Sequence, residues 1–214
     1  YCDFVSSIWD FSINLEKKIK SMTLNCNGKI LDFSTKKIMG IVNISKDSFF
    51  DGGQYDTIDK VNNQVSKLIS NGADIIDLGA ASSKPGSKLI KPEEEYDLIH
   101  NYINELTSNF SEVLFSIDTY NSSIADFALS KGFSLVNDIS SGKYDKNIFQ
   151  VIKKYNAGYI MMHMKGDPIN MQENTNYDNV VDSIVSFFKL KINELEKLGF
   201  SNIIIDPGFG FGKS

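Results

Sequence analysis

The sequence predicts an α/β fold built from repeated strand–helix units. Three observations support this prediction: six short apolar runs recur along the chain, helix-like patterns lie between several of them, and glycines stand where some of those helices should end. The runs are nearly continuous instead of alternating, which is typical of parallel strands covered on both faces. The predicted strands are residues 38–43, 74–78, 113–118, 133–138, 158–163 and 202–206.

A β-hairpin is predicted ahead of the first of these strands. Asn27 and Gly28 separate two short runs in the segment TLNCNGKILDF. A two-residue hairpin turn needs positive φ at both central positions, which Asn and Gly adopt more readily than other residues.

Three helices are predicted from their patterns and boundaries. Residues 57–71 place their apolar side chains on one face and are followed by Gly72. Pro92 opens a second helix, and the three glutamates after it favour the positive end of a helix dipole. Residues 178–198 form the third, which Gly199 ends.

Composition limits the function classes. The chain has 214 residues, a formal charge of −5 and 42% hydrophobic residues, as expected of a globular protein with a core. The acidic balance argues against a nucleic-acid partner, and the absence of a long apolar run argues against a membrane partner. Cys2 and Cys26 are too few for a disulfide scaffold, so we expect free thiols and a cytoplasmic location.

The chain is predicted to consist of a short N-terminal segment and one larger domain. Residues 1–21 do not resemble a signal peptide, because lysines follow the apolar stretch instead of preceding it. One hypothesis is that Met22 is the natural start and that 1–21 is an upstream segment. The alternative is an amphipathic helix packed on the domain formed by 22–214.

Polar residues at the strand ends favour a barrel over a doubly wound sheet. No G-x-G-x-x-G motif follows the first strand, as a dinucleotide-binding sheet would require. A (β/α)8 TIM barrel gathers its functional groups at the carboxyl ends of its strands, and about six of its βα units would be present here. The polar residues that close the runs are Asn43, Asp77, Asp118, Asn137 with Asp138, His163 and Asp206.

Each of these groups has a functional and a structural interpretation. The carboxylate of Asp206 could accept two hydrogen bonds from the N–H and NH2 edge of a guanine-like ring, or it could cap the following turn. Ser83 and Lys84 could bind an anion, although composition alone favours an ordinary loop. Asn43 could complete a Mg²⁺ sphere supplied mainly by phosphates and water. His163 is expected to be a packed residue instead of a general base.

Taken together, these segments resemble the dihydropteroate synthase family from about residue 22 to the last residue. The motifs appear in the family's order: IMGIVNISKDSFFDGG, GADIIDLGAASSKPGS, SIDTYNSSIA, VNDISSG, MMHMKGDPINMQ and DPGFGFGKS. The resemblance implies a (β/α)8 barrel with an N-terminal hairpin. It also implies the condensation of 6-hydroxymethyl-7,8-dihydropterin diphosphate with p-aminobenzoate, which gives 7,8-dihydropteroate and diphosphate in folate biosynthesis.

The resemblance further implies a role for each site residue. Asp118, Asn137 and Asp206 would hold the pterin ring, and Met162 would pack against it. Ser83 and Lys84 would close over the diphosphate and p-aminobenzoate, and Phe211 would lie beside the aminobenzoate. Asn43 would sit with Mg²⁺ and the diphosphate. Asp118 and Lys84 are the two residues expected to be catalytic.

The resemblance is incomplete in two respects. Lys84 stands where the family usually has Arg, whose planar fork binds oxyanions more specifically than a point charge does. The family's Lys on strand seven and its Arg-x-His motif after strand eight do not occur within these 214 residues. We therefore expect residues 1–214, expressed alone, to be poorly soluble or molten and inactive, and we expect a homodimer if the protein is full length.

Two alternative functions share the same barrel. A pterin-dependent methyltransferase would bind a methylated folate in a similar pocket. A truncated pterin-binding fragment without activity is the other alternative. The loops DSFFDGG and SSKPG favour the synthase, because a diphosphate and an aminobenzoate need loops to close over them.

Overall fold

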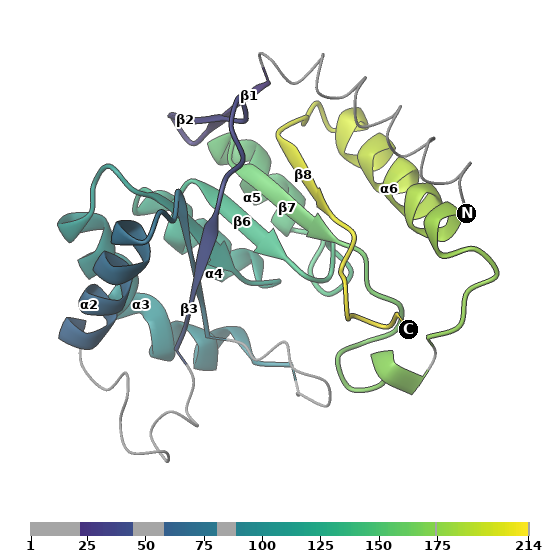
Figure 1. Cartoon of the computed structure of the whole chain (residues 1–214), viewed down its shortest axis with the longest axis horizontal. Coiled ribbons are helices and arrows are strands. Elements are labelled where there is room, and N and C mark those ends of the chain that lie inside the picture. Colours follow the sequence, from purple (N-terminus) through teal and green to yellow (C-terminus); the bar gives the residue numbers. More distant parts are fainter. Residues whose placement is uncertain (1–21, 45–57, 81–88, 174, 214) are drawn as a thin grey trace.

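The computed structural model describes residues 22–44, 58–80, 89–173 and 175–213 as a two-stranded hairpin and a six-stranded sheet with helices (Figure 1). The strands are β1 (Thr23–Cys26), β2 (Lys29–Asp32), β3 (Met39–Asn43), β4 (Ile75–Gly79), β5 (Leu114–Asp118), β6 (Leu135–Asp138), β7 (Gly158–Met162) and β8 (Ile203–Asp206). The helices are α2 (Ile58–Ser70), α3 (Pro92–Asn109), α4 (Ser122–Ser130), α5 (Ile148–Tyr155), the 3-10 turn η2 (Met171–Glu173) and α6 (Val180–Lys197).

The predicted hairpin is confirmed. β1 and β2 pair antiparallel, with Cys26 opposite Lys29. Asn27 and Gly28 between them have φ values of 51° and 86°, both in the left-handed region that this turn requires.

The six-stranded sheet is entirely parallel, and its strands follow one another in chain order from β3 to β8. Each strand therefore returns to the sheet beside its predecessor, as in the predicted barrel. Within the described residues the sheet is open between β3 and β8. Ile41 on β3 and Ile205 on β8 are accordingly 62% and 53% exposed.

The main hydrophobic core lies between the outer face of the sheet and its helices. Each strand contributes alternate residues to it, such as Val42, Leu78, Ile117 and Met161. The helices contribute the apolar stripe that the sequence predicted, including Val65 of α2. Side chains on the other alternation therefore face the interior of the curved sheet.

The hairpin fills one end of this interior. Cys26 and Leu31 pack against Ile75, Leu135 and Ile160, which are inner-face residues of three strands. Figure 1 shows the hairpin at the end of the sheet where these strands begin. The opposite end, where the strands finish, is the end at which a barrel of this type carries its functional groups.

The strand boundaries agree with the sequence predictions to within two residues. The three predicted helices correspond to α2, α3 and α6, and Pro92 occupies the first turn of α3 as expected. Gly72 and Gly199 adopt φ values of 96° and 74°, which explains why glycine ends α2 and α6. The proposal for residues 1–21 lies outside the described residues.

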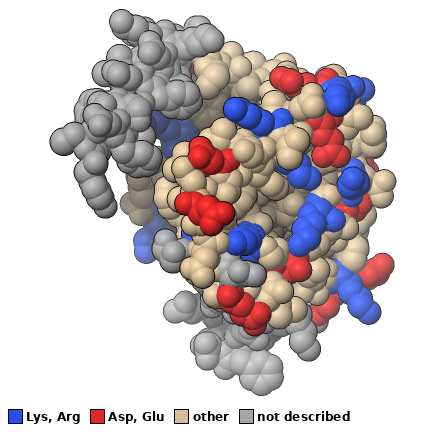
Figure 2. Space-filling view, turned by 90° about the vertical axis from the view of Figure 1, so that its right-hand side faces the viewer, with Lys and Arg blue, Asp and Glu red and all other residues tan. Residues whose placement is uncertain are grey.

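In the part of the chain that the structure describes, no helix is both long and apolar enough to cross a membrane. Figure 2 shows one face of the molecule, on which acidic and basic side chains are interspersed. Such mixing is typical of a solvated surface, and the described residues on that face form no continuous basic patch.

Candidate active site

Polar side chains meet at the carboxyl end of the parallel sheet. Asn43 pairs in register with Gly79 on β4, Gly79 with Asp118 on β5, and Asp118 with Asn137 on β6. Because residues in register on neighbouring strands point to the same face, these side chains share the interior of the sheet. Asp206 ends β8 on the same face, two residues after Ile204, which packs into the interior. The structure thus brings together four of the site residues predicted from the sequence.

Gly79 makes room for two of these side chains. A Cβ atom at Gly79 would lie 3.1 Å from Oδ2 of Asp118 and 3.2 Å from Oδ1 of Asn43. Both oxygens therefore lie over the backbone of Gly79, each closer than ordinary van der Waals contact to the place that a Cβ atom would occupy. A side chain at residue 79 would push them apart, so the glycine shapes the floor of the site.

Asp77 does not end its strand, contrary to the sequence prediction. β4 continues to Gly79, which leaves Asp77 in the middle of the strand and one layer deeper in the interior. Its Oδ2 accepts a hydrogen bond of 2.9 Å from Nδ2 of Asn137, and the side chain is 2% exposed. Asp77 therefore orients the amide of Asn137 from below and leaves the amide oxygen of Asn137 to face other groups.

Several carboxyl groups lie close together in and beside the site. Burial, followed by repulsion from Asp77, Glu95 and Asp138, raises the pKa of Asp118 well above its ordinary value. Burial also raises the pKa of Asp77 and of Asp138. Asp118 itself is still partly reachable by solvent. A ligand that brings N–H donors to Asp118 would relieve this unfavourable arrangement.

Apolar residues form one wall beside these polar groups. Met162, Tyr120 and Ile139 are buried together, and Phe211 packs against them. Met162 and Phe211 were predicted as site residues, and the structure places them in one cluster. Tyr120 and Ile139 were not predicted, although each follows a predicted site residue, Asp118 or Asn137, by two positions. That spacing from a strand end is the signal that could have identified them.

Asp206 shows the structural role that the sequence left open. Its Oδ1 accepts a 2.8 Å hydrogen bond from the backbone N–H of Gly208 and so caps the turn after β8. Its backbone oxygen accepts a 3.0 Å bond from the N–H of His163. The capping bond uses one carboxylate oxygen and fixes the orientation of the group, which is compatible with a ligand at the other oxygen.

His163 is a packed residue, as predicted. Its ring lies edge-on to Phe187 with 5.0 Å between the centroids, and it is 7% exposed. Burial and the nearby ammonium of Lys213 lower its pKa.

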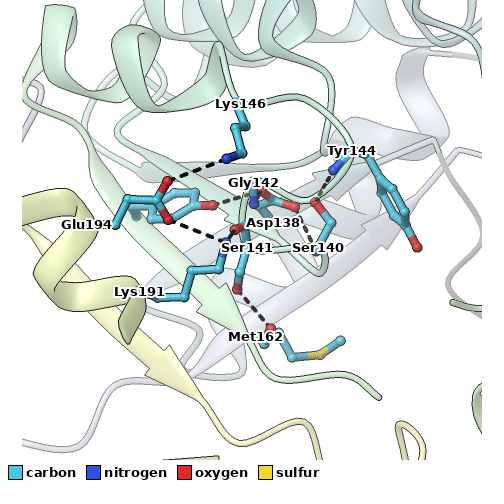
Figure 3. Close-up of polar contacts among 10 residues, drawn as sticks. Asp138, Ser140, Ser141, Gly142, Tyr144, Lys146, Met162, Lys191 and Glu194 are labelled. Atoms are coloured by element: carbon cyan, nitrogen blue, oxygen red, sulfur yellow. Dashed lines mark hydrogen bonds and ion pairs between the residues drawn. The ribbon is translucent and has the colours of Figure 1, made fainter. Parts of the chain in front are cut away.

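A carboxylate organises the loop after β6 (Figure 3). Asp138 accepts hydrogen bonds from the backbone N–H groups of Ser140 and Gly142, at 2.7 and 2.8 Å, and from the hydroxyl of Tyr159, at 2.7 Å. Ser141 Oγ in turn donates to the carbonyl of Met162 at 2.9 Å. The buried Asp138 therefore fixes the loop against β7, and it points away from the interior that Asn137 faces.

A cavity of about 300 Å³ is lined in part by this loop, and Met162 and Ile139 belong to its wall. Three lysines line it, but each already has a protein partner. Lys191 Nζ donates to the Ser141 carbonyl at 2.7 Å, Lys143 pairs with Asp167 at 2.5 Å, and Lys146 lies 3.9 Å from Glu194. Because these lysines are already paired within the protein, the cavity is part of the wall of the site and not a cationic pocket that could bind an anion.

Two predicted site residues, Ser83 and Lys84, lie outside the described residues, as does the loop DSFFDGG. Among the described residues, no three His, Cys, Asp or Glu side chains cluster closely enough to hold a metal ion. Asn43 offers a single amide oxygen at the floor of the site. This fits a cation held mainly by ligand oxygens and water, and it does not fit a metal held by the protein alone.

Comparison with known proteins identifies the class. A family model described as pterin binding enzyme matches residues 39–214. The chain therefore belongs to the pterin binding enzyme family.

Relatives within this family are named for folate synthesis. Dihydropteroate synthase of Haemophilus influenzae is 36% identical over 195 residues, which cover 90% of this chain and 70% of that protein. The mitochondrial folate synthesis bifunctional protein of Arabidopsis thaliana is 40% identical over 193 residues, which cover 87% of this chain and 35% of that protein. The chain thus spans only about a third of the plant protein.

Solved structures of dihydropteroate synthases are similar in fold to this chain. Dihydropteroate synthase of Yersinia pestis, in complex with a sulfonamide drug, matches with a TM-score of 0.83 and 33% identity, covering 90% of this chain and 70% of that chain. The Xanthomonas albilineans enzyme with 4-aminobenzoic acid matches with a TM-score of 0.80 and 31% identity, covering 91% and 69%. The similarity of fold extends over almost all of the chain.

Proposed function

We propose that this chain is the pterin-binding part of a dihydropteroate synthase. The observation that carries the proposal is the convergence of Asp118, Asn137 and Asp206 beside the apolar pair of Met162 and Phe211. A flat heterocycle with an amidine-like edge needs both kinds of surface, because its edge donates hydrogen bonds and its faces are apolar. The named functions of the relatives support the same reading.

In this proposal the protein positions its substrates and supplies no nucleophile. The arylamine nitrogen of p-aminobenzoate forms a bond to the methylene carbon of the dihydropterin while the bond from that carbon to the diphosphate oxygen breaks. The arylamine nitrogen then releases a proton to water. Catalysis therefore rests on alignment and on stabilisation of the leaving diphosphate.

Each residue has a defined task in this reaction. Asp118 and Asp206 accept hydrogen bonds from the pterin edge, and Asn137, held by Asp77, adds an oriented amide. Met162 covers a face of the ring, and Phe211 borders the arylamine. Ser83 and Lys84 would contact the diphosphate, with Lys84 offering a positive charge to the leaving group.

Asn43 would add its amide oxygen to Mg²⁺ that the diphosphate brings. Bound there, the ion would neutralise charge on the leaving group. A cytoplasmic location and a homodimer remain predictions from the sequence and the family.

The direct test is formation of 7,8-dihydropteroate by the protein expressed from its complete gene. The substrates are 6-hydroxymethyl-7,8-dihydropterin diphosphate and p-aminobenzoate, and product is measured by chromatography with and without Mg²⁺. We expect product to form only with the metal. A protein that is stabilised against heat by methyltetrahydrofolate, and that forms no dihydropteroate, would instead be a pterin-dependent methyltransferase.

A further inference from the structure

Lys213 connects the loop after β8 to the end of β7. Its ammonium donates to three carbonyl oxygens: that of His163 at 2.9 Å, that of Gly208 at 2.9 Å and that of Phe211 at 3.0 Å. An ammonium has three N–H donors, so all of them are used. A three-carbonyl site of this kind suits a compact point charge better than a planar guanidinium.

The loop and the end of β7 are packed too closely for ordinary side chains. Gly208 has φ of 68°, and a Cβ atom there would lie 2.2 Å from the carbonyl oxygen of His163. Two further side chains donate to carbonyls of the same loop, Gln172 to Gly210 at 2.8 Å and Tyr177 to Gly212 at 3.0 Å. The loop after β8 is therefore bonded to the loop after β7 along its length.

This bonding decides which phenylalanine faces the site. Phe211 packs on the cluster of Met162, Ile139 and Tyr120, whereas Phe209 is 86% exposed. The N–H of Phe211 donates to the carbonyl of Gly208 at 3.1 Å, and its own carbonyl is one of the three that Lys213 binds. The backbone on both sides of the Phe211 side chain is thus held in place.

We propose that Lys213 is a positioning residue that sets the place of Phe211 and thereby shapes the subsite for the arylamine substrate. This inference rests on the proposed function, because it assigns Phe211 to the arylamine. Loss of the ammonium removes a donor from three partly buried carbonyls, of which that of Gly208 keeps the N–H of Phe211, and the loop must shift for the carbonyls of His163 and Phe211 to reach water. The proposed pterin contacts of Asp118 and Asn137 come from other strands and stay in place, whereas Asp206 is oriented by the N–H of Gly208, so a smaller effect on the pterin is expected.

The test compares Lys213→Met with the wild type in the protein expressed from its complete gene. Methionine keeps the length and apolar stem of the side chain but removes the charge. We expect the KM for p-aminobenzoate to rise about tenfold or more, and the KM for the dihydropterin diphosphate to change less than about threefold. Lys189→Met, at an exposed site on α6, is the control for loss of one positive charge.

A second variant guards against a general loss of structure. Lys213→Arg keeps the charge but cannot converge on three carbonyls, so we expect a smaller rise in the same KM. Amide hydrogen exchange should become faster at residues 208–213 in Lys213→Met and stay unchanged in β5 and β6.

The outcomes separate this inference from the proposed function. Wild-type protein that forms no dihydropteroate overturns both. An active wild type in which Lys213→Met changes both KM values equally, changes neither, or unfolds together with Lys213→Arg overturns the inference about Lys213 alone.

Discussion

The side chains of Asp77, Glu95 and Asp138 are buried in or beside the wall of the sheet, and that of Asp118 is partly buried among them, so the fold must stabilise four carboxyl groups. Asp77 and Asp138 have hydrogen-bond donors close by. Glu95, on α3, is completely buried and accepts a short hydrogen bond from the amide of Asn121. Because burial disfavours the charge of these carboxyl groups, replacing one of them by its amide can raise the stability of the fold while it weakens ligand binding.

Asp118→Asn should stabilise the fold and weaken the binding of a pterin. The substitution removes a charge that burial and the carboxylates of Asp77, Glu95 and Asp138 disfavour. We expect the melting temperature at pH 8 to rise by a few degrees while the Kd for a pterin rises about tenfold or more. Calorimetry measures both quantities. A lower melting temperature with unchanged pterin affinity would contradict the assignment.

Glu95 should make stability depend on pH. Burial raises its pKa from 4.5 to about 7, so the folded state favours the protonated form. Its contribution is complete below pH 4.5 and is lost as the pH rises through 7. The loss is about 3 kcal/mol at most. The charge of Glu95 also acts on two neighbouring titratable groups, and it contributes to the raised pKa of Asp118 and of Tyr120.

The measurement is urea denaturation at several pH values of the protein expressed from its complete gene, as the wild type and as Glu95→Gln. The amide of Gln keeps an acceptor for Asn121 but does not titrate. We expect the decline in stability between pH 5 and 8 to be smaller in the variant than in the wild type, because Asp77, Asp118 and Asp138, whose pKa values are also raised, still titrate in both proteins. Glu93→Gln, at an exposed position on the same helix, is the matched control. Parallel curves for wild type and Glu95→Gln would exclude Glu95 as the titrating group.

At the scale of elements, the start of β7 and the end of β1 are in direct contact. Gly158 opens β7, and a Cβ atom there would lie 2.8 Å from Sγ of Cys26 and 3.1 Å from Cδ2 of Leu135. Cys26 is fully buried, so it has no free space into which to move. The contact between the hairpin and the sheet thus depends on the absence of a side chain at residue 158.

Gly158→Ala should destabilise the protein by about 1–3 kcal/mol, because the added methyl group overpacks this contact. Cys26→Ala frees space at the same place. In the double variant the two changes should compensate, so that its loss of stability is smaller than the sum of the single losses. Urea denaturation of the four proteins measures this. Strict additivity would show that the two residues do not compete for one space.

The elements most fully predicted from the sequence were those with strong local signals. The apolar runs gave the six strands, and Asn27–Gly28 gave the hairpin. Helices α4 and α5 have 9 and 8 residues, which is too short for a reliable periodic pattern. Asp77 was misplaced because nothing in the local sequence shows that β4 continues to Gly79.

The site was predictable where its residues end strands and less so where its residues depend on contacts between distant segments. Strand ends mark Asn43, Asp118, Asn137 and Asp206 because parallel strands finish at a common edge. The roles of Glu95 and Lys213 depend on contacts between segments that are far apart in the sequence. No spacing rule reveals a lysine that binds three carbonyls.

At the scale of the whole molecule, amide side chains join the hairpin to helix α4 and to the loops that precede β6 and β8. Nδ2 of Asn27 donates to the carbonyls of Leu129 and Phe133, at 2.9 and 2.8 Å. Asn202, just before β8, donates to the carbonyl of Asn25 at 2.8 Å. These bonds join the first strands to the later part of the chain.

Asn27→Asp should cost about 3 kcal/mol. Asp tolerates the left-handed backbone of residue 27, but its carboxylate cannot donate to the two carbonyls and repels them. Asn25→Asp is a matched control, because Oδ1 of Asn25 accepts a bond from the N–H of Gly28 and a carboxylate accepts it equally well. Thermal denaturation compares the two variants. Equal losses would mean that the turn, and not the link to α4 and the loop before β6, sets the effect.

The position of the hairpin also affects the order in which the chain can fold. Each strand of the sheet pairs with the next one in sequence, so the sheet can grow as the chain leaves the ribosome. The hairpin emerges before the sheet, but Asn25 meets Asn156 and Asn202 only 131 and 177 residues later. Its apolar side chains can meet Ile75 and Leu135 earlier, but they cannot complete their packing until β7 supplies Ile160. Final docking of the hairpin is therefore a late step, with the largest loop-closure cost among these contacts.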